Sequence, residues 1–71
     1  MITLNQAQTG RSYRIAWLLG SVGQALEENL GMRPDDRLDV KQNSWVGSVV
    51  DYNGKLIAMS HEAAHYVKLV S

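Results

Sequence analysis

The chain has 71 residues, enough for one domain (residues 1–71) with a small core, and it has no cysteine for disulfides or thiolate metal sites. Seven basic and seven acidic residues give a net charge of zero, which argues against nucleic acid as a partner. The longest apolar run, Ile15 to Leu19, is far shorter than the ~20 residues that span a bilayer, so we expect a cytoplasmic protein without direct membrane insertion.

The first third of the sequence predicts one strand and one helix. The first ten residues end in a polar stretch with a turn glycine, so we expect a lead-in before the first strand. Alternating residues from Tyr13 to Leu19 predict a strand with Trp17 on its buried side. Ser21 is a favourable N-cap, and Val22, Leu26 and Leu30 form one apolar stripe of a short helix.

The rest of the sequence reads as short strands joined by turns. Gly31 is a typical helix end, and Pro34 and Asp35 suit the centre of a β-turn. Asn53 and Gly54 suit a type I′ hairpin. Ser60 is expected to cap a single helical turn. The four further strands that these signals delimit run over residues 37–42, 45–52, 55–59 and 66–70.

These elements predict a mainly β fold. About five short strands are too few for two stacked sheets, and closing them into a barrel protects the sheet edges. We therefore expect a small, partly open SH3-like β-barrel. The one short α-helix lies between the first and second strands and covers one end of the barrel.

Several stretches resemble the ferrous iron transport protein A (FeoA) family. Leu26, Leu30-Gly31-Met32 and Pro34 are similar to that family's link between helix and second strand. The opening Leu4-Asn5-Gln6 with Thr9-Gly10, and the closing residues 60–67, are similar to its two ends, so the resemblance covers nearly the whole chain. Two positions depart from the pattern: Asp35 replaces the usual glycine, and Trp45 occupies a loop where small or polar residues are expected.

The resemblance implies a function that composition and spacing do not. It implies a non-enzymatic cytoplasmic accessory protein of ferrous iron uptake, which binds or regulates a membrane ferrous iron permease with a GTPase domain at the inner face of the membrane. It also implies kinship with the C-terminal SH3-like domain of metal-dependent repressors. The alternative is therefore a stand-alone SH3-like module that binds a peptide or a transition metal. Binding of Fe(II) or another transition metal, and weak homo-oligomer formation, stay open.

Residues 61–65 match the His-Glu-x-x-His pattern of zinc hydrolases. Two histidines four residues apart lie on one helical face, and the glutamate between them can activate a zinc-bound water. A catalytic site also needs a third protein ligand, which would have to be a carboxylate such as Asp51 or Glu28 that the fold brings close. We expect instead a capped helical turn, with His61 and His65 as weak metal candidates, no catalytic residues and no cofactor.

Four residues are candidates for contact with a protein partner. Trp45 follows two turn residues, so it lies either at a loop tip, where exposed tryptophan often contributes to binding, or folded back over the barrel mouth. Met32, Arg33 and Asp35 lie in the turn after the helix. The expected contact surfaces are therefore the exposed side of the helix, the turn that follows it and the Trp45 loop.

Overall fold

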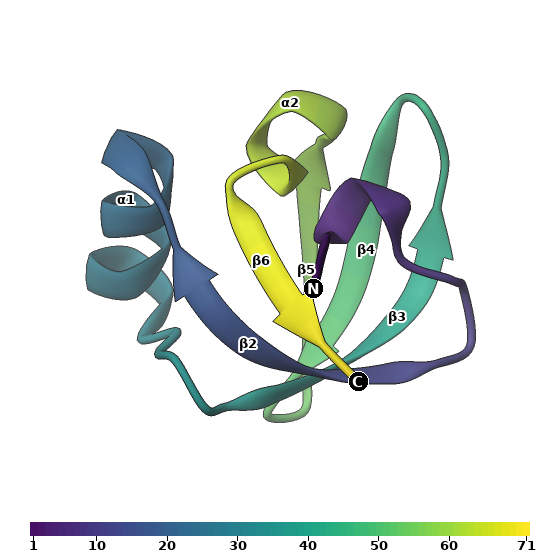
Figure 1. Ribbon diagram of the computed structural model, residues 1–71, viewed down its shortest axis with the longest axis horizontal. Helices are drawn as coiled ribbons and strands as arrows, with labels where there is room; N and C mark the ends of the chain where they lie inside the picture. The colour runs from purple at the N-terminus through teal and green to yellow at the C-terminus, as the bar shows by residue number, and fades with distance from the viewer.

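A computed structural model describes all 71 residues of the chain. Six strands form a single sheet that curls into a barrel, and two α-helices and one 3₁₀ helix lie around it (Figure 1). In chain order, the elements are β1 (Ile2–Thr3), η1 (Leu4–Gln6), β2 (Ser12–Leu18), α1 (Gly20–Leu30), β3 (Arg37–Asn43), β4 (Gly47–Tyr52), β5 (Lys55–Ser60), α2 (His61–Ala64) and β6 (Val67–Val70). The expected SH3-like β fold is confirmed, including the helix before β3 and the helical turn before the last strand.

The sheet is antiparallel throughout, in the order β1-β6-β2-β3-β4-β5. Its two edges are therefore β1, with two residues, and β5, with six. The short elements η1 and α2 contact each other and close one end of the barrel (Figure 1). The Asn53-Gly54 turn has positive φ at both residues, 53° and 82°, as a type I′ hairpin requires.

The core is one apolar cluster inside the barrel. Its members alternate along the strands, as the burial pattern of β4 illustrates with Ser48, Val50 and Tyr52 facing inward. The largest fully buried apolar side chains are those of Leu4, Ile15, Met32, Leu38, Val40, Val50, Val67 and Leu69. Because the buried cluster as a whole draws on η1, α2 and five of the six strands, the barrel has one shared core rather than local clusters.

The predicted lead-in is the first correction. Residues 2–6 form β1 and η1, and both Thr3 and Leu4 are buried. Asn43 holds this segment because its Nδ2 donates to the carbonyl oxygens of Leu4 at 3.0 Å and Ala7 at 2.7 Å. The segment is therefore held to the barrel through its backbone carbonyl groups and its buried Leu4 side chain.

Trp17 was predicted in the core and is instead 56% exposed. Its strand has a β-bulge: Ile15 pairs with Leu69 and Trp17 with Lys68, so Ala16 is an extra residue between them. An extra residue reverses the inward and outward alternation of a strand. Ile15 is consequently buried, and Trp17 faces solvent.

The helix begins and packs differently from the prediction. It begins at Gly20 after Leu19, and Ser21 makes no capping bond. The helix lies beside β2 (Figure 1), where a Cβ on Gly23 would come within 2.8 Å of the Leu18 carbonyl oxygen. Only Leu26 of the predicted stripe packs against the core, and Leu30 is 39% exposed. The helix thus flanks the barrel more than it covers it.

Candidate functional site

The loop between β3 and β4 presents two adjacent apolar side chains to solvent. Trp45 is 84% exposed and Val46 is 66% exposed. The loop is held by the Ser44 backbone N–H, which donates to the Gly47 carbonyl at 2.9 Å, and by the Val46 N–H, which donates to Ser44 Oγ at 3.2 Å. A loop fixed in this way loses little conformational entropy when a partner binds.

Helix α2 packs directly against this loop. The His61 backbone N–H donates to the Val46 carbonyl at 3.1 Å, and Gly47 pairs with Ser60 across β4 and β5. Ser60 caps the helix as predicted, since its Oγ accepts from the Ala63 N–H at 3.0 Å. The tryptophan loop and the two histidines therefore belong to one end of the barrel.

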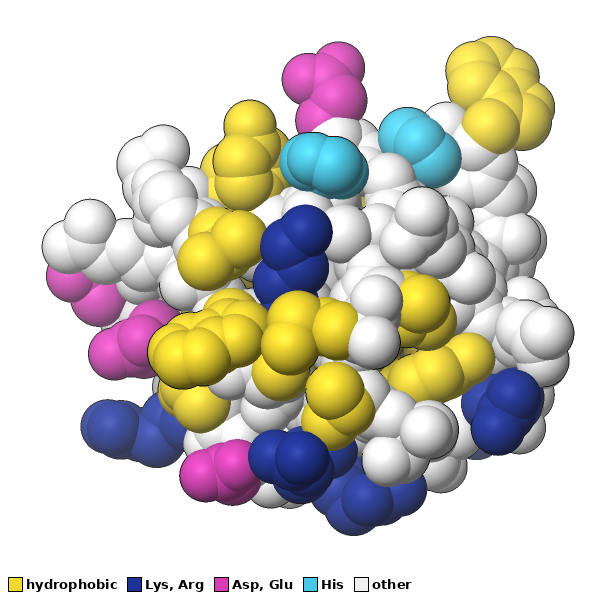
Figure 2. All heavy atoms as spheres, viewed as in Figure 1, with side chains coloured by type: hydrophobic (Ala, Val, Ile, Leu, Met, Phe, Trp, Pro, Cys, Tyr) yellow, Lys and Arg dark blue, Asp and Glu magenta, His cyan; other side chains and the backbone are white.

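Two shallow hollows connect Trp45 to His65. The first, of about 330 Å³, reaches from Trp45 to Asn5 and His61, and the second, of about 250 Å³, reaches from Asn5 and His61 to His65. Asn5 Nδ2 lies 3.4 Å from His61 Nε2 on the boundary that both hollows share. We call the surface of Asn5, Trp45, Val46, His61 and His65 the Trp45 face. Figure 2 shows both histidines along this end and one hydrophobic side chain standing clear of the surface near the β3–β4 loop.

The residues of the His-Glu-x-x-His pattern do not assemble a hydrolase site. No group of three or more His, Asp or Glu side chains comes close enough to hold a metal ion together. Asp51 instead accepts a hydrogen bond from the Gly54 N–H at 3.0 Å in the β4–β5 hairpin, and Glu28 accepts one from Gln24 on α1. The third ligand that a zinc hydrolase requires is therefore missing. His61 Nδ1 is buried without a hydrogen-bond partner.

The turn after α1 lies far from the Trp45 face, and one of its predicted contact residues is buried. Met32 has no exposed surface, which corrects the prediction that it contacts a partner. The left-handed Gly31 reverses the chain, and Met32 N–H donates to the Leu26 carbonyl while its side chain enters the core. Arg33 and Asp35 are exposed. The turn meets the Tyr52 end of β4, whereas Trp45 precedes its Gly47 end.

The separation of these two regions follows from strand length. The six residues of β4 are joined by five steps of about 3.3 Å each, so the two ends of the strand lie roughly 16 Å apart. Trp45 and the turn after α1 therefore lie at opposite ends of β4. Asp35 keeps the turn geometry that a glycine would give, with φ of 78°, and its carboxylate pairs with Arg14 at 2.8 Å.

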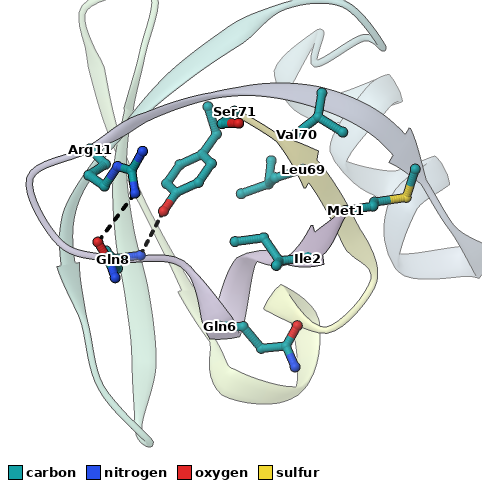
Figure 3. Close-up of a pocket in the computed structure, with 9 residues that line it drawn as sticks. Met1, Ile2, Gln6, Gln8, Arg11, Leu69, Val70 and Ser71 are labelled. Atoms are coloured by element: carbon teal, nitrogen blue, oxygen red, sulfur yellow. Dashed lines mark hydrogen bonds between the residues drawn. The ribbon is translucent and has the colours of Figure 1, made fainter.

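A hollow of about 470 Å³ near the paired first and last strands was not foreseen from the sequence. Ile2 and Leu69 form its apolar floor, and Arg11 and Gln8 lie at its rim (Figure 3). The Arg11 guanidinium donates to Gln8 Oε1 at 3.4 Å, and the Gln8 N–H donates to Tyr13 Oη at 3.0 Å. Nothing in the sequence could indicate this hollow, because it requires the pairing of residues 2–3 with residues 68–69.

The chain folds as a small SH3-like β-barrel with the Trp45 face exposed at one end. No helix of the structure has the length and apolar character needed to cross a membrane. No protein-family model matches the sequence, and no curated protein matches it.

Solved structures match the chain over nearly its whole length. An iron uptake regulatory protein (FeoA) superposes with a TM-score of 0.82 at 20% identity, covering 97% of this chain and 93% of that one. The FeoA protein from Chlorobium tepidum gives 0.77 at 18% identity, covering 96% and 68%. A manganese-dependent transcriptional repressor gives 0.83 at 19% identity, covering 97% of this chain but only 40% of the repressor. The fold is therefore that of FeoA proteins and of the SH3-like domains in such repressors.

Proposed function

We propose that this protein is an accessory protein of ferrous iron uptake, located in the cytoplasm at the inner face of the membrane. The observation that supports this role most is the match to a FeoA structure across 97% of this chain and 93% of the other. The match to the repressor covers only 40% of the repressor, whose remaining parts have no counterpart here. This chain therefore covers nearly all of the FeoA protein but less than half of the repressor, which favours the FeoA-like role over the repressor-like alternative.

The proposed partner is the cytoplasmic GTPase-bearing part of a membrane ferrous iron permease, bound through the Trp45 face. Tryptophan is enriched among residues that dominate binding energy, and it contributes most where surrounding groups exclude water. Trp45 is 84% exposed on a loop that its own hydrogen bonds hold. Polar groups of Asn5 and His61 border it in the adjoining hollow. This arrangement of an apolar anchor with a polar border is typical of a protein contact.

The mechanism would be a shift in the conformational equilibrium of the permease. A protein that binds one state of its partner better than another moves the population toward that state. This mode of action requires no catalytic residues in the module. It requires only a surface whose contacts differ between the two states.

A binding experiment with paired tryptophan variants tests the proposal. The cytoplasmic domain of the permease from the same organism is immobilised and titrated with wild type, Trp45→Ala and Trp17→Ala. Both tryptophans are exposed, but Trp17 lies on β2, outside the Trp45 face. We expect Trp45→Ala to weaken binding by about 30-fold, corresponding to about 2 kcal/mol at a hot spot, and Trp17→Ala to bind within about twofold of wild type.

Circular dichroism of both variants confirms that each is folded. Absence of binding by folded wild-type protein would count against the accessory role. Equal binding by wild type and Trp45→Ala would support the permease as the partner but contradict the Trp45 face as the contact surface.

A further inference from the structure

The strand β5 ends the sheet with a full-length unpaired edge. It pairs with β4 on one side only, while the other edge of the sheet, β1, has just two residues. An exposed strand edge offers free backbone N–H and C=O groups to another strand. Leu56 in this strand is 69% exposed, and Ala58 is exposed as well.

The register of the β4–β5 hairpin identifies which backbone groups are free. Tyr52 and Lys55 flank the two-residue turn and pair directly, so they exchange hydrogen bonds, as does the Val50–Ile57 pair. The intervening residues Leu56 and Ala58 then direct their N–H and C=O groups away from β4. No turn, loop or cap bond of the structure uses these groups.

We propose that two copies of this chain associate by antiparallel pairing of their β5 edges around a twofold axis at Ile57. In this register, Leu56 of one copy lies opposite Ala58 of the other, and both residues carry the free backbone groups. Each such pair can exchange its N–H···O=C bonds. The proposal does not depend on the proposed role in iron uptake.

The side chains of β5 suit a second copy of the same strand. Lys55 is the only charged residue of β5, and in this register it lies opposite Met59 rather than another lysine. Like charges directly opposite each other would oppose the pairing, and this register avoids them. The large Leu56 lies beside the small Ala58 of the other copy.

A hollow on the outer face of the sheet can accept this leucine. Its volume is about 600 Å³, and its floor includes Gly47, Val49 and Ala58. Val49 pairs with Ala58 across the two strands, so the hollow reaches the free edge. The exposed Leu56 side chain of one copy can therefore be buried over Ala58 of the other, and the twofold axis repeats this contact.

The available area indicates a weak dimer. A standard interface buries about 800 Å² on each partner, nearly a fifth of the 4361 Å² surface of this chain. One six-residue edge with a single anchoring side chain buries less than that. We expect a dissociation constant on the order of 0.1–1 mM.

The test is sedimentation equilibrium over a concentration range of roughly 10 μM to 2 mM, which brackets the expected dissociation constant. Wild type should shift from monomer toward dimer as its concentration rises. Ala58→Pro removes the outward N–H without removing a bond to β4, so it should weaken dimerisation by at least about tenfold. Trp17→Lys changes an exposed side chain on β2 and should dimerise like wild type.

Concentration-dependent amide shifts in NMR spectra identify the residues of the dimer interface. They should be largest at Leu56 and Ala58, and the spectra also confirm that Ala58→Pro is folded. A wild type that stays monomeric over the whole range would overturn the proposal. A dimer whose shifts lie elsewhere, or that persists unchanged in folded Ala58→Pro, would overturn it as well.

Discussion

The hydroxyl of Tyr52, at the end of β4, donates a hydrogen bond to the carboxylate of Asp36, which precedes β3. The same hydroxyl lies 3.0 Å from the carbonyl oxygen of Gly31, at the end of α1. Tyr52 is 4% exposed and Asp36 is half-buried, so this contact is partly shielded from solvent. One side chain thus fixes the turn from helix to sheet against the barrel.

Replacing Tyr52 by phenylalanine should destabilise the protein by about 2 kcal/mol. A hydrogen bond to a charged group contributes about 1.5–3 kcal/mol, and its loss leaves the buried groups without their donor. Urea denaturation at neutral pH measures the change in the free energy of unfolding. Tyr66→Phe, at a more exposed tyrosine, serves as the control and should change it by less than about 0.5 kcal/mol.

The same contact predicts a loss of stability at alkaline pH. The hydrogen bond to Asp36, together with burial and the nearby negative charge, raises the pKa of Tyr52 above its usual value. The contact needs the protonated hydroxyl. Its stabilisation is therefore complete below pH about 10, the pKa of an unfolded tyrosine, and is lost as pH rises through the higher folded value.

Urea denaturation from pH 9 upward tests this dependence. The difference in stability between wild type and Tyr52→Phe should shrink as the pH rises above about 10. A difference that stays constant up to the pH of alkaline unfolding would contradict the assigned hydrogen bond.

Adding a methyl group to Gly23 should destabilise the helix packing. A Cβ at this position would lie 2.8 Å from the Leu18 carbonyl oxygen and even closer to its carbon, and backbone cannot move aside cheaply. Gly23→Ala should therefore cost about 2 kcal/mol in urea denaturation, despite the better helix propensity of alanine. Gln24→Ala, on the exposed face of the same helix, should cost less than about 0.5 kcal/mol.

The sequence predicted the elements where local chemistry decides the structure. The Asn53-Gly54 turn, the Ser60 cap and the alternating β4 strand need only their neighbours to form. The turn residues before Trp45 left both a loop tip and a folded-back position open, and the structure shows the side chain 84% exposed. The local signals therefore account for the β4–β5 hairpin and the start of α2.

Long-range pairing determined what the sequence could not predict. The bulge at Ala16 depends on the register between β2 and β6, and it moves Trp17 from the expected core to the surface. The burial of Met32 depends on how the turn after Gly31 meets the barrel. The proximity of the Trp45 loop to His61 depends on the β4–β5 pairing. The sequence therefore pointed to these residues one by one, but it did not indicate that they lie on one face.

Removing the Asn43 side chain should release the N-terminal segment. Its amide donates to two carbonyls of residues 4–7 and accepts from the nearly fully buried Ser48 hydroxyl at 2.7 Å. Asn43→Ala leaves these groups without partners, so we expect a loss of about 2–3 kcal/mol. Hydrogen exchange of the Ala7 amide, which donates to the Leu4 carbonyl in η1, should accelerate more than that of the β4 amides. Uniform acceleration would contradict a local role.

Asp35 occupies a backbone conformation that suits glycine. With φ of 78°, a residue with a Cβ other than Asn or Asp pays about 1–2 kcal/mol. Asp35→Gly should therefore be more stable than Asp35→Ala by about 1 kcal/mol, although both lose the exposed pair with Arg14. Thermal unfolding of the two variants measures the difference. Equal stability would show that the turn relaxes when the side chain changes.

The contact through the Trp45 face can be observed residue by residue, because the chain has only two tryptophans. Their indole N–H signals are recorded in ¹⁵N-labelled protein while the permease cytoplasmic domain is added. We predict that the Trp45 indole and the Val46 and His61 amides shift or broaden first, while the Trp17 indole stays in place. A spectrum that does not change, or one in which only the Trp17 indole moves, would contradict the proposed contact.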